Sequence, residues 1–444
     1  MQRQAATPKG LERRLRDLEL AQVADPRQAR KVKLALPALL AALVTAMVTQ
    51  ARSLRAVEQR TAQVVCKLGA WLGIARRIAD NTFTKLLPRL PFADLVACLH
   101  RLVKAEHRRG NLAPTHLTVG AIAIDGKNSA TLRWHDLCRV LDLEPQMATA
   151  AQVKEQLAAA YPAAQFCVPN EGRPYALMRV HTVTLISAAA APCIHLRPIE
   201  GRTNEAGAMP ALLDEVAGAY GRTGLFRLLT TDAGNTALGI QTDIIDRGWQ
   251  YCAQIKSEHG DLYAEAEREL GARRHDSAAA NYVDSENGEH VTYHLWAYDL
   301  EGAGWLDWTH ARQLLRVERI AVKPQTGERT VGNRYYVTSL PPADLGPKAA
   351  LSTTRAHWRC EEETHWTADA ELGEDRRRLA WSRHPNGVLA VAAIRMIALA
   401  ILAVARRLSR LGYTRETPTW HQVAEHFLLE LCGSILETAA FDDA

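Results

Sequence analysis

Acidic and aromatic side chains are concentrated in one segment, RAHWRCEEETHWTADAELGEDRRR, which runs from Arg355 to Arg378. If this segment is helical, residues three and four apart share a face, so acids and rings come together. The residues concerned are Trp358, Glu361, Glu362, His365, Trp366 and Asp369. Acids on the same flank as tryptophans suggest carboxylates that point into a cleft. A charged surface helix with incidental tryptophans is the other interpretation.

Two more acids follow predicted strands earlier in the chain. The apolar runs Leu117–Ile124 and Leu225–Thr231 read as buried strands, and they end at Asp125-Gly126, interpreted as a turn, and at Asp232. Open α/β sheets bind ligands at the carboxyl ends of their strands. Carboxylates from two strand ends and a later helix would suit Mg²⁺ or Mn²⁺, and two such ions about 3.5–4 Å apart promote phosphodiester cleavage. A turn or cap role for either aspartate is the alternative.

Other chemistries find less support in the sequence. His357, Glu361 and His365 are spaced as on a zinc-binding helix, but no cysteine or third histidine has a supporting spacing. The G-x-S-x-G, P-loop and H-E-x-x-H motifs are absent. The 8 cysteines are scattered without a C-x-x-C pair, which predicts reduced thiols in a cytoplasmic protein.

Charge is distributed unevenly along the chain. Residues 1–110 hold 21 Lys and Arg against 8 Asp and Glu, whereas residues 111–444 hold 33 against 41. A basic first quarter suggests a module that binds a polyanion, joined to a part that holds cations; a basic solvated surface is the alternative. The apolar run Val388–Ala405 is long enough to cross a membrane, but Arg395 in its middle would be costly in lipid. We therefore expect a buried core helix and no membrane association.

The hydrophobic pattern divides the chain into four parts. We expect a helical, basic DNA-binding domain over 1–115, the first part of an α/β core over 116–257, a mostly β insertion over 258–345, and completion of the core with C-terminal helices over 346–444. In the core, the pattern predicts strands at 117–124, 176–187, 193–199, 225–231 and 249–256, and helices at 151–160, 205–220 and 236–247. Three strands followed by alternating helix and strand predict a mixed sheet with helices on its faces.

The segment Ala79–Leu90 of the first part predicts a short basic helix. Asp80 or Asn81 is a plausible N-cap, and Lys85 and Arg89 stand four residues apart. A capped basic helix after two others fits a helix-turn-helix-like DNA reader. A plain helical bundle fits equally.

Several stretches resemble the DDE transposases of bacterial insertion sequences, particularly the H-repeat-associated branch. They are AIAIDGKNSA (121–130), RPIEGRTNEAGAMPALLDE (197–215), LLTTDAGNTA (228–237), YCAQIK (251–256) and the acidic segment 355–378. The last is similar to the family's Arg-x-His-Trp-x-Ile-Glu-Asn, His-Trp and Glu-Asp signature, with Cys360 in place of Ile and Glu362 in place of Asn. The resemblance extends loosely over residues 30–410.

This resemblance implies an RNase H-like catalytic core with the triad Asp125, Asp232 and Glu361. Asp125 would bridge two Mg²⁺ (or Mn²⁺) ions, and the other two acids would each complete one ion. The implied function is a transposase that binds the terminal inverted repeats of its element, cleaves the DNA and joins the ends to target DNA, acting as a homodimer on double-stranded DNA. A transposase-derived DNA-binding protein without catalysis, and a nuclease of the same fold that cleaves without joining, are the alternatives.

Further residues are expected to support this function. His357 and His365 would position the site or the DNA, although packed histidines are the plainer interpretation. The candidates for DNA contact are Lys85, Arg89, Lys256, Arg355, Arg376, Arg377 and Arg378.

Overall fold

The computed structural model describes residues 7–63, 72, 74, 77–115, 117–286, 288–301, 306–374, 381–409 and 417–439. Its helices are α1 (Pro8–Asp17), α2 (Leu36–Val48), α3 (Leu54–Gln63), α5 (Asp80–Leu86), α6 (Phe92–Arg108), α7 (Trp134–Val140), α8 (Ala150–Ala160), α9 (Glu205–Tyr220), α10 (Leu238–Asp246), α11 (Gly260–Leu270), α12 (Pro347–Ala356), the π-helix η8 (Cys360–His365), α13 (Trp366–Ala370), α14 (Pro385–Leu408) and α15 (Trp420–Ala439). Its strands are β1 (Ala121–Arg133), β2 (Ala164–Cys167), β3 (Tyr175–Thr184), β4 (Cys193–Pro198), β5 (Leu228–Thr231), β6 (Gln250–Ile255), β7 (Ala280–Glu286), β8 (Glu289–Asp299), β9 (Gln313–Val322) and β10 (Arg329–Thr338).

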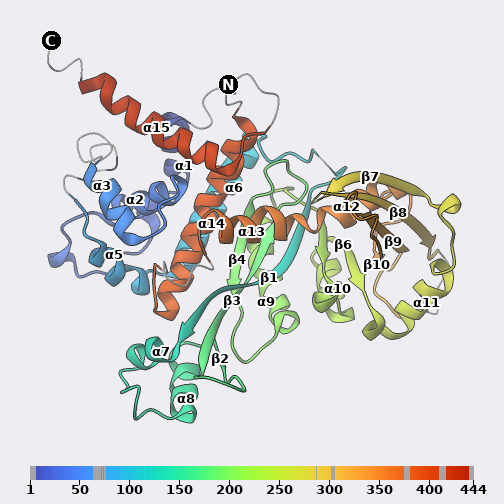
Figure 1. The fold of residues 1–444 in the computed structure, drawn as a ribbon, viewed down its shortest axis with the longest axis horizontal. Helices are drawn as coiled ribbons and strands as arrows, with labels where there is room; N and C mark the ends of the chain where they lie inside the picture. The colour runs from blue at the N-terminus through green and yellow to red at the C-terminus, as the bar shows by residue number, and fades with distance from the viewer. Residues whose placement is uncertain are drawn as a thin grey trace.

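One mixed sheet runs through the middle of the molecule (Figure 1). Its strand order is β2-β3-β1-β5-β6-β10-β9-β8-β7, with β4 paired to β3. The β1–β5 and β5–β6 pairs are parallel and the remaining pairs are antiparallel. In chain order, the antiparallel strands β1, β3 and β4 precede α9-β5-α10-β6. The predicted mixed α/β sheet with helices at both ends of the chain is therefore confirmed.

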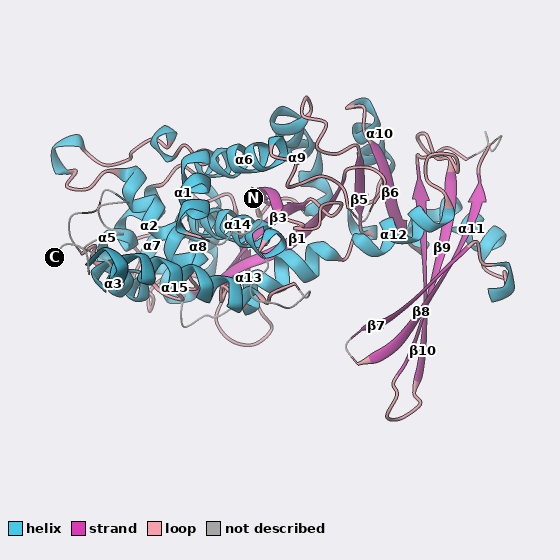
Figure 2. Ribbon diagram, turned by 90° about the horizontal axis from the view of Figure 1, so that it is seen from above, coloured by secondary structure: helices cyan, strands magenta, loops and turns pink. Residues whose placement is uncertain are grey.

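The β-rich part of the chain extends this sheet. Strand β10 is hydrogen-bonded to β6, with Tyr335 opposite Ile255, and β9, β8 and β7 follow in turn. Figure 2 shows these strands projecting beyond the rest of the molecule. Pairing with β10 covers an edge of β6 that would otherwise present unpaired backbone groups. We call β7–β10 the sheet extension.

Helix α14 forms the centre of the helical part, where it packs against α2, α6 and α15 (Figure 1). Among the helices that the structure describes, it alone is long and apolar enough to cross a membrane, and its apolar stretch is wholly buried inside the protein. The prediction of a buried core helix is confirmed. Its buried charge is neutralised because Arg395 Nη1 lies 2.8 Å from Glu374 Oε1.

The start of α5 differs from the prediction. Neither Asp80 nor Asn81 is the N-cap: the helix begins at Asp80 after Ala79, and no side chain caps it. The backbone N–H of Asp80 instead donates to Glu58 Oε2 at 3.3 Å. A carboxylate from α3 thus accepts the hydrogen bond that a capping side chain would otherwise accept. The sequence of α5 alone cannot predict this contact, because the acceptor lies in another helix.

Loss of the buried Arg395 charge should destabilise the fold. The change Arg395→Met leaves Glu374 buried without its guanidinium partner, so we expect the free energy of unfolding to fall by about 3 kcal/mol. The double variant Arg395→Met/Glu374→Gln should lose less than the two single changes added together. Urea unfolding followed by circular dichroism measures both quantities. Additive losses would show that the two side chains do not interact.

Candidate active site

Asp125 lies within a strand, not at the end of one. Strand β1 continues past it to Arg133, paired with β3 along the way. The predicted turn at Asp125-Gly126 is therefore wrong. Antiparallel pairing with β3 supplies partners for the backbone beyond Ile124, which the apolar run alone does not reveal.

Asp125 and Asp232 nevertheless occupy matching positions on neighbouring strands. The parallel ladder between β1 and β5 ends with Ile124 opposite Thr231. The next residue on each chain is the aspartate, and neighbouring strands lie about 4.8 Å apart. The two carboxylates therefore emerge side by side where the parallel ladder stops.

Asp232 also caps a short turn. Its Oδ1 accepts hydrogen bonds from the backbone N–H of Asn235 at 3.1 Å and from Asn235 Nδ2 at 2.9 Å. The cap role considered for strand-end aspartates is thus real here. It occupies one oxygen, and these bonds fix the orientation of the carboxylate.

Glu361 belongs to the π-helix η8, which follows α12 closely in the chain. A π-helical turn is wider than an α-turn, so the predicted common flank does not form. Glu361 and Glu362 line a cleft with Trp358, whereas Trp366 is 57% exposed. Asp369 instead binds Lys127. Single π-helical turns occur frequently at functional sites.

A row of polar contacts, which we call the threonine seam, joins η8 and the end of α12 to the sheet. His357 Nδ1 lies 2.9 Å from Thr230 Oγ1, Thr364 Oγ1 lies 2.9 Å from Thr184 Oγ1, and His365 Nε2 lies 2.7 Å from Thr182 Oγ1. The threonines come from β5 and β3, which flank β1 on both sides. The seam therefore fixes the position and orientation of η8, which carries Glu361, relative to the strand that carries Asp125.

Both seam histidines are neutral at pH 7. Burial lowers the pKa of His357 to about 4. Burial, assisted by the charge of Lys127, lowers the pKa of His365 to about 3. His365 Nδ1 lies 3.5 Å from Asp125 Oδ2, so it contributes a polar contact to the carboxylate and no positive charge.

Lys127 binds the residues that follow Glu361 in the chain. Its Nζ lies 2.8 Å from Asp369 Oδ1 and Oδ2, and 3.5 Å from Glu374 Oε2. It also donates to the backbone oxygen of His365 at 3.4 Å. Because Lys127 stands two residues after Asp125, this contact couples β1 directly to the segment that carries Glu361.

The electrostatics at Asp125 are unusual for an aspartate. Its pKa is raised to about 7, first by burial and then by the negative charges of Asp232, Glu361 and Glu205. The backbone N–H of Gly126, at 2.8 Å from Oδ1, opposes this shift. The carboxylates are therefore close enough to resist ionisation of the most buried member.

These acids differ from their neighbours in having no cationic partner. Within the described residues, neither Lys nor Arg forms an ion pair with Asp125, Asp232, Glu205 or Glu361. By contrast, Glu363 binds Arg406 at 3.2 Å, and Asp369 binds Lys127. A converging group of uncompensated carboxylates is the arrangement that a cation site requires.

Glu205 is a member that the pattern of strand ends does not predict. It is the first residue of α9, after the N-cap Asn204. A Cβ added to Gly126 would lie 2.3 Å from Glu205 Oε1, so this carboxylate sits directly over the residue that follows Asp125. The only sequence signal is its place in the Thr-Asn-Glu segment that resembles the transposase family.

Cys360 closes the site from the helix side. It is fully buried, and its thiol donates towards Asp125 Oδ2 at a sulfur–oxygen distance of 3.8 Å. Burial together with the charges of Asp125 and Glu361 raises the thiol pKa well above its usual value. Cys360 therefore stays protonated and is a packing and hydrogen-bonding group.

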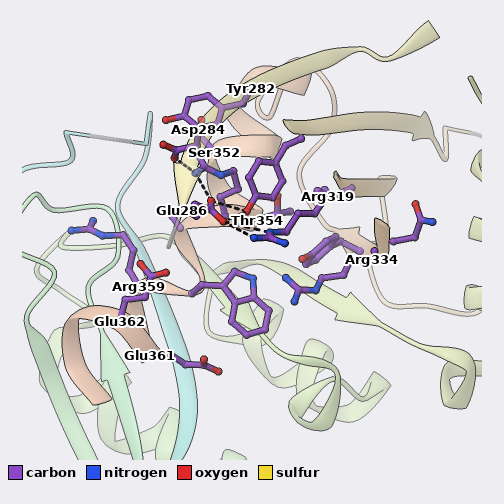
Figure 3. A pocket seen from close by; sticks show the side chains of 18 of the residues that line it. Tyr282, Asp284, Glu286, Arg319, Arg334, Ser352, Thr354, Arg359, Glu361 and Glu362 are labelled. Atoms are coloured by element: carbon purple, nitrogen blue, oxygen red, sulfur yellow. Dashed lines mark hydrogen bonds and ion pairs between the residues drawn. The ribbon is translucent and has the colours of Figure 1, made fainter. Parts of the chain in front are cut away.

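A cleft of about 1060 Å³ opens beside Glu361, between η8 and the sheet extension (Figure 3). Arg355, a predicted DNA contact, lies in its wall and is engaged within the protein. Its Nη2 is 2.7 Å from Asp284 Oδ2, and its guanidinium stacks on the rings of Tyr282 and Tyr293. Arg334, another of the arginines that line the cleft, stacks over Trp358 at 4.3 Å from the ring centre.

The remaining predicted DNA contacts are not gathered at this cleft. Lys85 and Arg89 are exposed in the helical part, and Arg89 also binds the backbone oxygen of Pro26. Lys256 is exposed and follows β6, a strand that lies on the other side of α14 from α5 (Figure 1). Arg376, Arg377 and Arg378 lie outside the described residues.

A different cluster has closely spaced ligand atoms. Within the described residues, His275, His294 and Glu318 alone bring such atoms within 4.8 Å of one another, and they could hold a metal ion. The zinc interpretation of His357, Glu361 and His365 gains no support. The ligand atoms of Asp125, Asp232 and Glu361 do not all lie within 4.8 Å of one another either. Two ions about 3.5–4 Å apart do not require this spacing, because ligands on their outer sides lie farther apart.

No protein-family model and no curated protein matches this chain. The site is therefore interpreted from its own geometry and charge.

Neutralising Asp125 should stabilise the metal-free protein. Because its folded pKa of about 7 exceeds the ordinary aspartate value of 3.8, the folded state loses stability as the pH rises between these values. Asp125→Asn removes this loss, so we expect a gain of roughly 2–4 kcal/mol above pH 7 that shrinks on acidification and disappears near pH 4. Urea unfolding in EDTA at several pH values measures it. The control is Asp344→Asn, at an exposed loop position; an equal and pH-independent effect of both changes would contradict the prediction.

The threonine seam makes a separate prediction. Thr184 and Thr364 are both 0% exposed and face each other. Thr184→Val or Thr364→Val alone leaves one buried hydroxyl without its partner and should cost about 1–2 kcal/mol. The double variant should recover about 1 kcal/mol of the summed loss, measured by thermal or urea unfolding. Strict additivity would mean that this contact does not dock η8.

Proposed function

We propose that this protein is a DNA transposase of the DDE type. It would bind the terminal inverted repeats of its element, cleave the DNA in a metal-dependent reaction and join the ends to target DNA. The observation that carries the proposal is the convergence of Asp125, Asp232 and Glu361, from adjacent strands and a docked π-helix, without a Lys or Arg partner among the described residues.

The arrangement of the sheet supports an RNase H-like core. The antiparallel strands β1, β3 and β4 are followed by α9-β5-α10-β6, with β5 and β6 parallel to β1. The residues between β6 and the helix bearing Glu361 form the sheet extension, which corresponds to the proposed insertion over 258–345. The first acid on β1, the second after β5 and the third on a helix beyond the extension fit the order implied by the family resemblance.

The donor set suits Mg²⁺ or Mn²⁺. Both are hard ions that prefer oxygen ligands, and the site offers carboxylates whose negative charge is uncompensated. Asp125, Asp232 and Glu361 would together hold the ions. Bound there, the ions would supply activation of the attacking oxygen and stabilisation of the leaving oxygen.

The reaction consists of two phosphodiester exchanges. Water attacks a phosphodiester at each element end, releasing a 3′-OH and a 5′-phosphate. The 3′-OH then attacks a target phosphodiester and displaces the target's own 3′-OH, so no external energy source is needed. The protein's own residues orient this chemistry: Asn235 holds Asp232, while Lys127 and the threonine seam hold the segment that carries Glu361.

The basic first quarter is the proposed DNA-binding part. Its exposed Lys85 and Arg89 are placed for phosphate contacts, since neither forms an ion pair with an acid among the described residues. Joining two element ends to one target requires the ends to be brought together, so we propose a homodimer on DNA. The buried core helix α14 and the free thiols of the cysteines that the structure describes agree with action in the cytoplasm.

The proposal is tested with Asp125→Asn, Asp232→Asn and Glu361→Gln. We expect each to lower Mn²⁺-dependent cleavage of a DNA end by more than about 100-fold, because even outer partners of a bound metal are worth 10–100-fold. Binding of the same DNA, followed by mobility shift, should survive. Glu362→Gln is the matched control, since Glu362 is exposed beside Glu361.

The outcomes separate the alternatives. Cleavage of the ends followed by joining of pre-cut 3′-OH ends to target DNA identifies a transposase. Cleavage without joining identifies a nuclease. DNA binding with no cleavage by the unaltered protein identifies a non-catalytic binding protein. Undiminished cleavage by any triad variant would remove that residue from the site.

A further inference from the structure

We propose that Glu205 is a fourth carboxylate ligand of the metal ions at Asp125, and that Gly126 is required to admit it. This inference rests on the proposed function and adds a residue that the expected triad does not contain. It is carried by the close approach of Glu205 to Gly126 and by the lack of a neutralising partner for Glu205 among the described residues.

The close approach is a consequence of the missing side chain at position 126. A Cβ built there would lie 2.3 Å from Glu205 Oε1 and 2.7 Å from Oε2, distances that real Cβ atoms do not show. Both carboxylate oxygens therefore occupy the space that any other residue would fill. Because Gly126 directly follows Asp125, Glu205 is brought to the edge of the acid cluster.

Glu205 has no partner that would explain this position structurally. It is half-buried, and among the described residues its carboxylate makes no hydrogen bond or ion pair. Its location at the first turn of α9 favours a negative charge there, but by less than about 1 kcal/mol at an exposed helix end. Meanwhile its charge opposes that of Asp125. A shared cation removes this repulsion and gives both acids a partner.

A second polar group lies unpartnered at the same register position. His181 is directly opposite Gly126 in the β1–β3 ladder and is 0% exposed. Neither ring nitrogen has a hydrogen-bond partner among the described residues. Buried polar atoms without partners are rare in folded proteins and often mark a bound water or ion. The backbone around Gly126 is thus lined by polar groups without a partner in the part of the chain that the structure describes.

The inference is tested by Mn²⁺ binding to the full-length protein without DNA, measured by isothermal titration calorimetry. Glu205→Gln should weaken binding at one ion by about tenfold or more, as loss of a metal-site partner typically does. Glu200→Gln is the matched control, because Glu200 is exposed and precedes α9. It should bind Mn²⁺ as the unaltered protein does.

Gly126→Ala provides a second, independent variant. The three atoms nearest the added methyl group all belong to the flexible end of the Glu205 side chain, so the fold should persist while the carboxylate is displaced. Gly126→Ala should weaken Mn²⁺ binding as Glu205→Gln does, and the double variant should show no further loss. Circular dichroism establishes that each variant is folded.

The outcomes distinguish this inference from the proposed function. Mn²⁺ binding that is unchanged in Glu205→Gln, but lost in Asp125→Asn, overturns the role of Glu205 and leaves the triad standing. No Mn²⁺ binding by the unaltered protein overturns both. Additive losses in the Gly126→Ala/Glu205→Gln double variant would refute the role assigned to Gly126.

Discussion

Mutual repulsion between carboxylates is the constraint on which the site depends. Asp125 is buried beside Asp232, with Glu361 and Glu205 close enough to raise its pKa to about 7. Four carboxylates this close together are stable only if the surrounding structure holds them in place or a cation neutralises their charge. The charged contacts nearby are directed elsewhere: Lys127 binds Asp369 and Glu374, and no described Lys or Arg forms an ion pair with the central acids.

The scaffold opposes this repulsion with neutral polar contacts. The threonine seam docks η8 on β3 and β5 through hydrogen bonds that bring no charge, since burial keeps His357 and His365 neutral. A seam of lysines or arginines would neutralise the acids and abolish the proposed cation site. Neutral donors instead give the helix a fixed position and leave the negative charge available.

The sequence predicts most of the strands, though not β2 or β7, together with the core helix α14 and the acids at the end of the parallel ladder, because these depend on apolar periodicity and local turns. It does not predict that β1 continues past Asp125, since β3 supplies that pairing from a distant part of the chain. The π-turn at Glu361 and the approach of Glu205 to Gly126 likewise depend on packing between segments far apart in sequence. Local periodicity contains no signal for either.

The most direct measurement is the anomalous scattering of crystals soaked in Mn²⁺. The account predicts peaks between Asp125, Asp232 and Glu361, with carboxylate oxygens at about 2.0–2.1 Å from the ion, the range of Mg²⁺ sites. Peaks confined to the cluster formed by His275, His294 and Glu318, or no peak near Asp125, would contradict it.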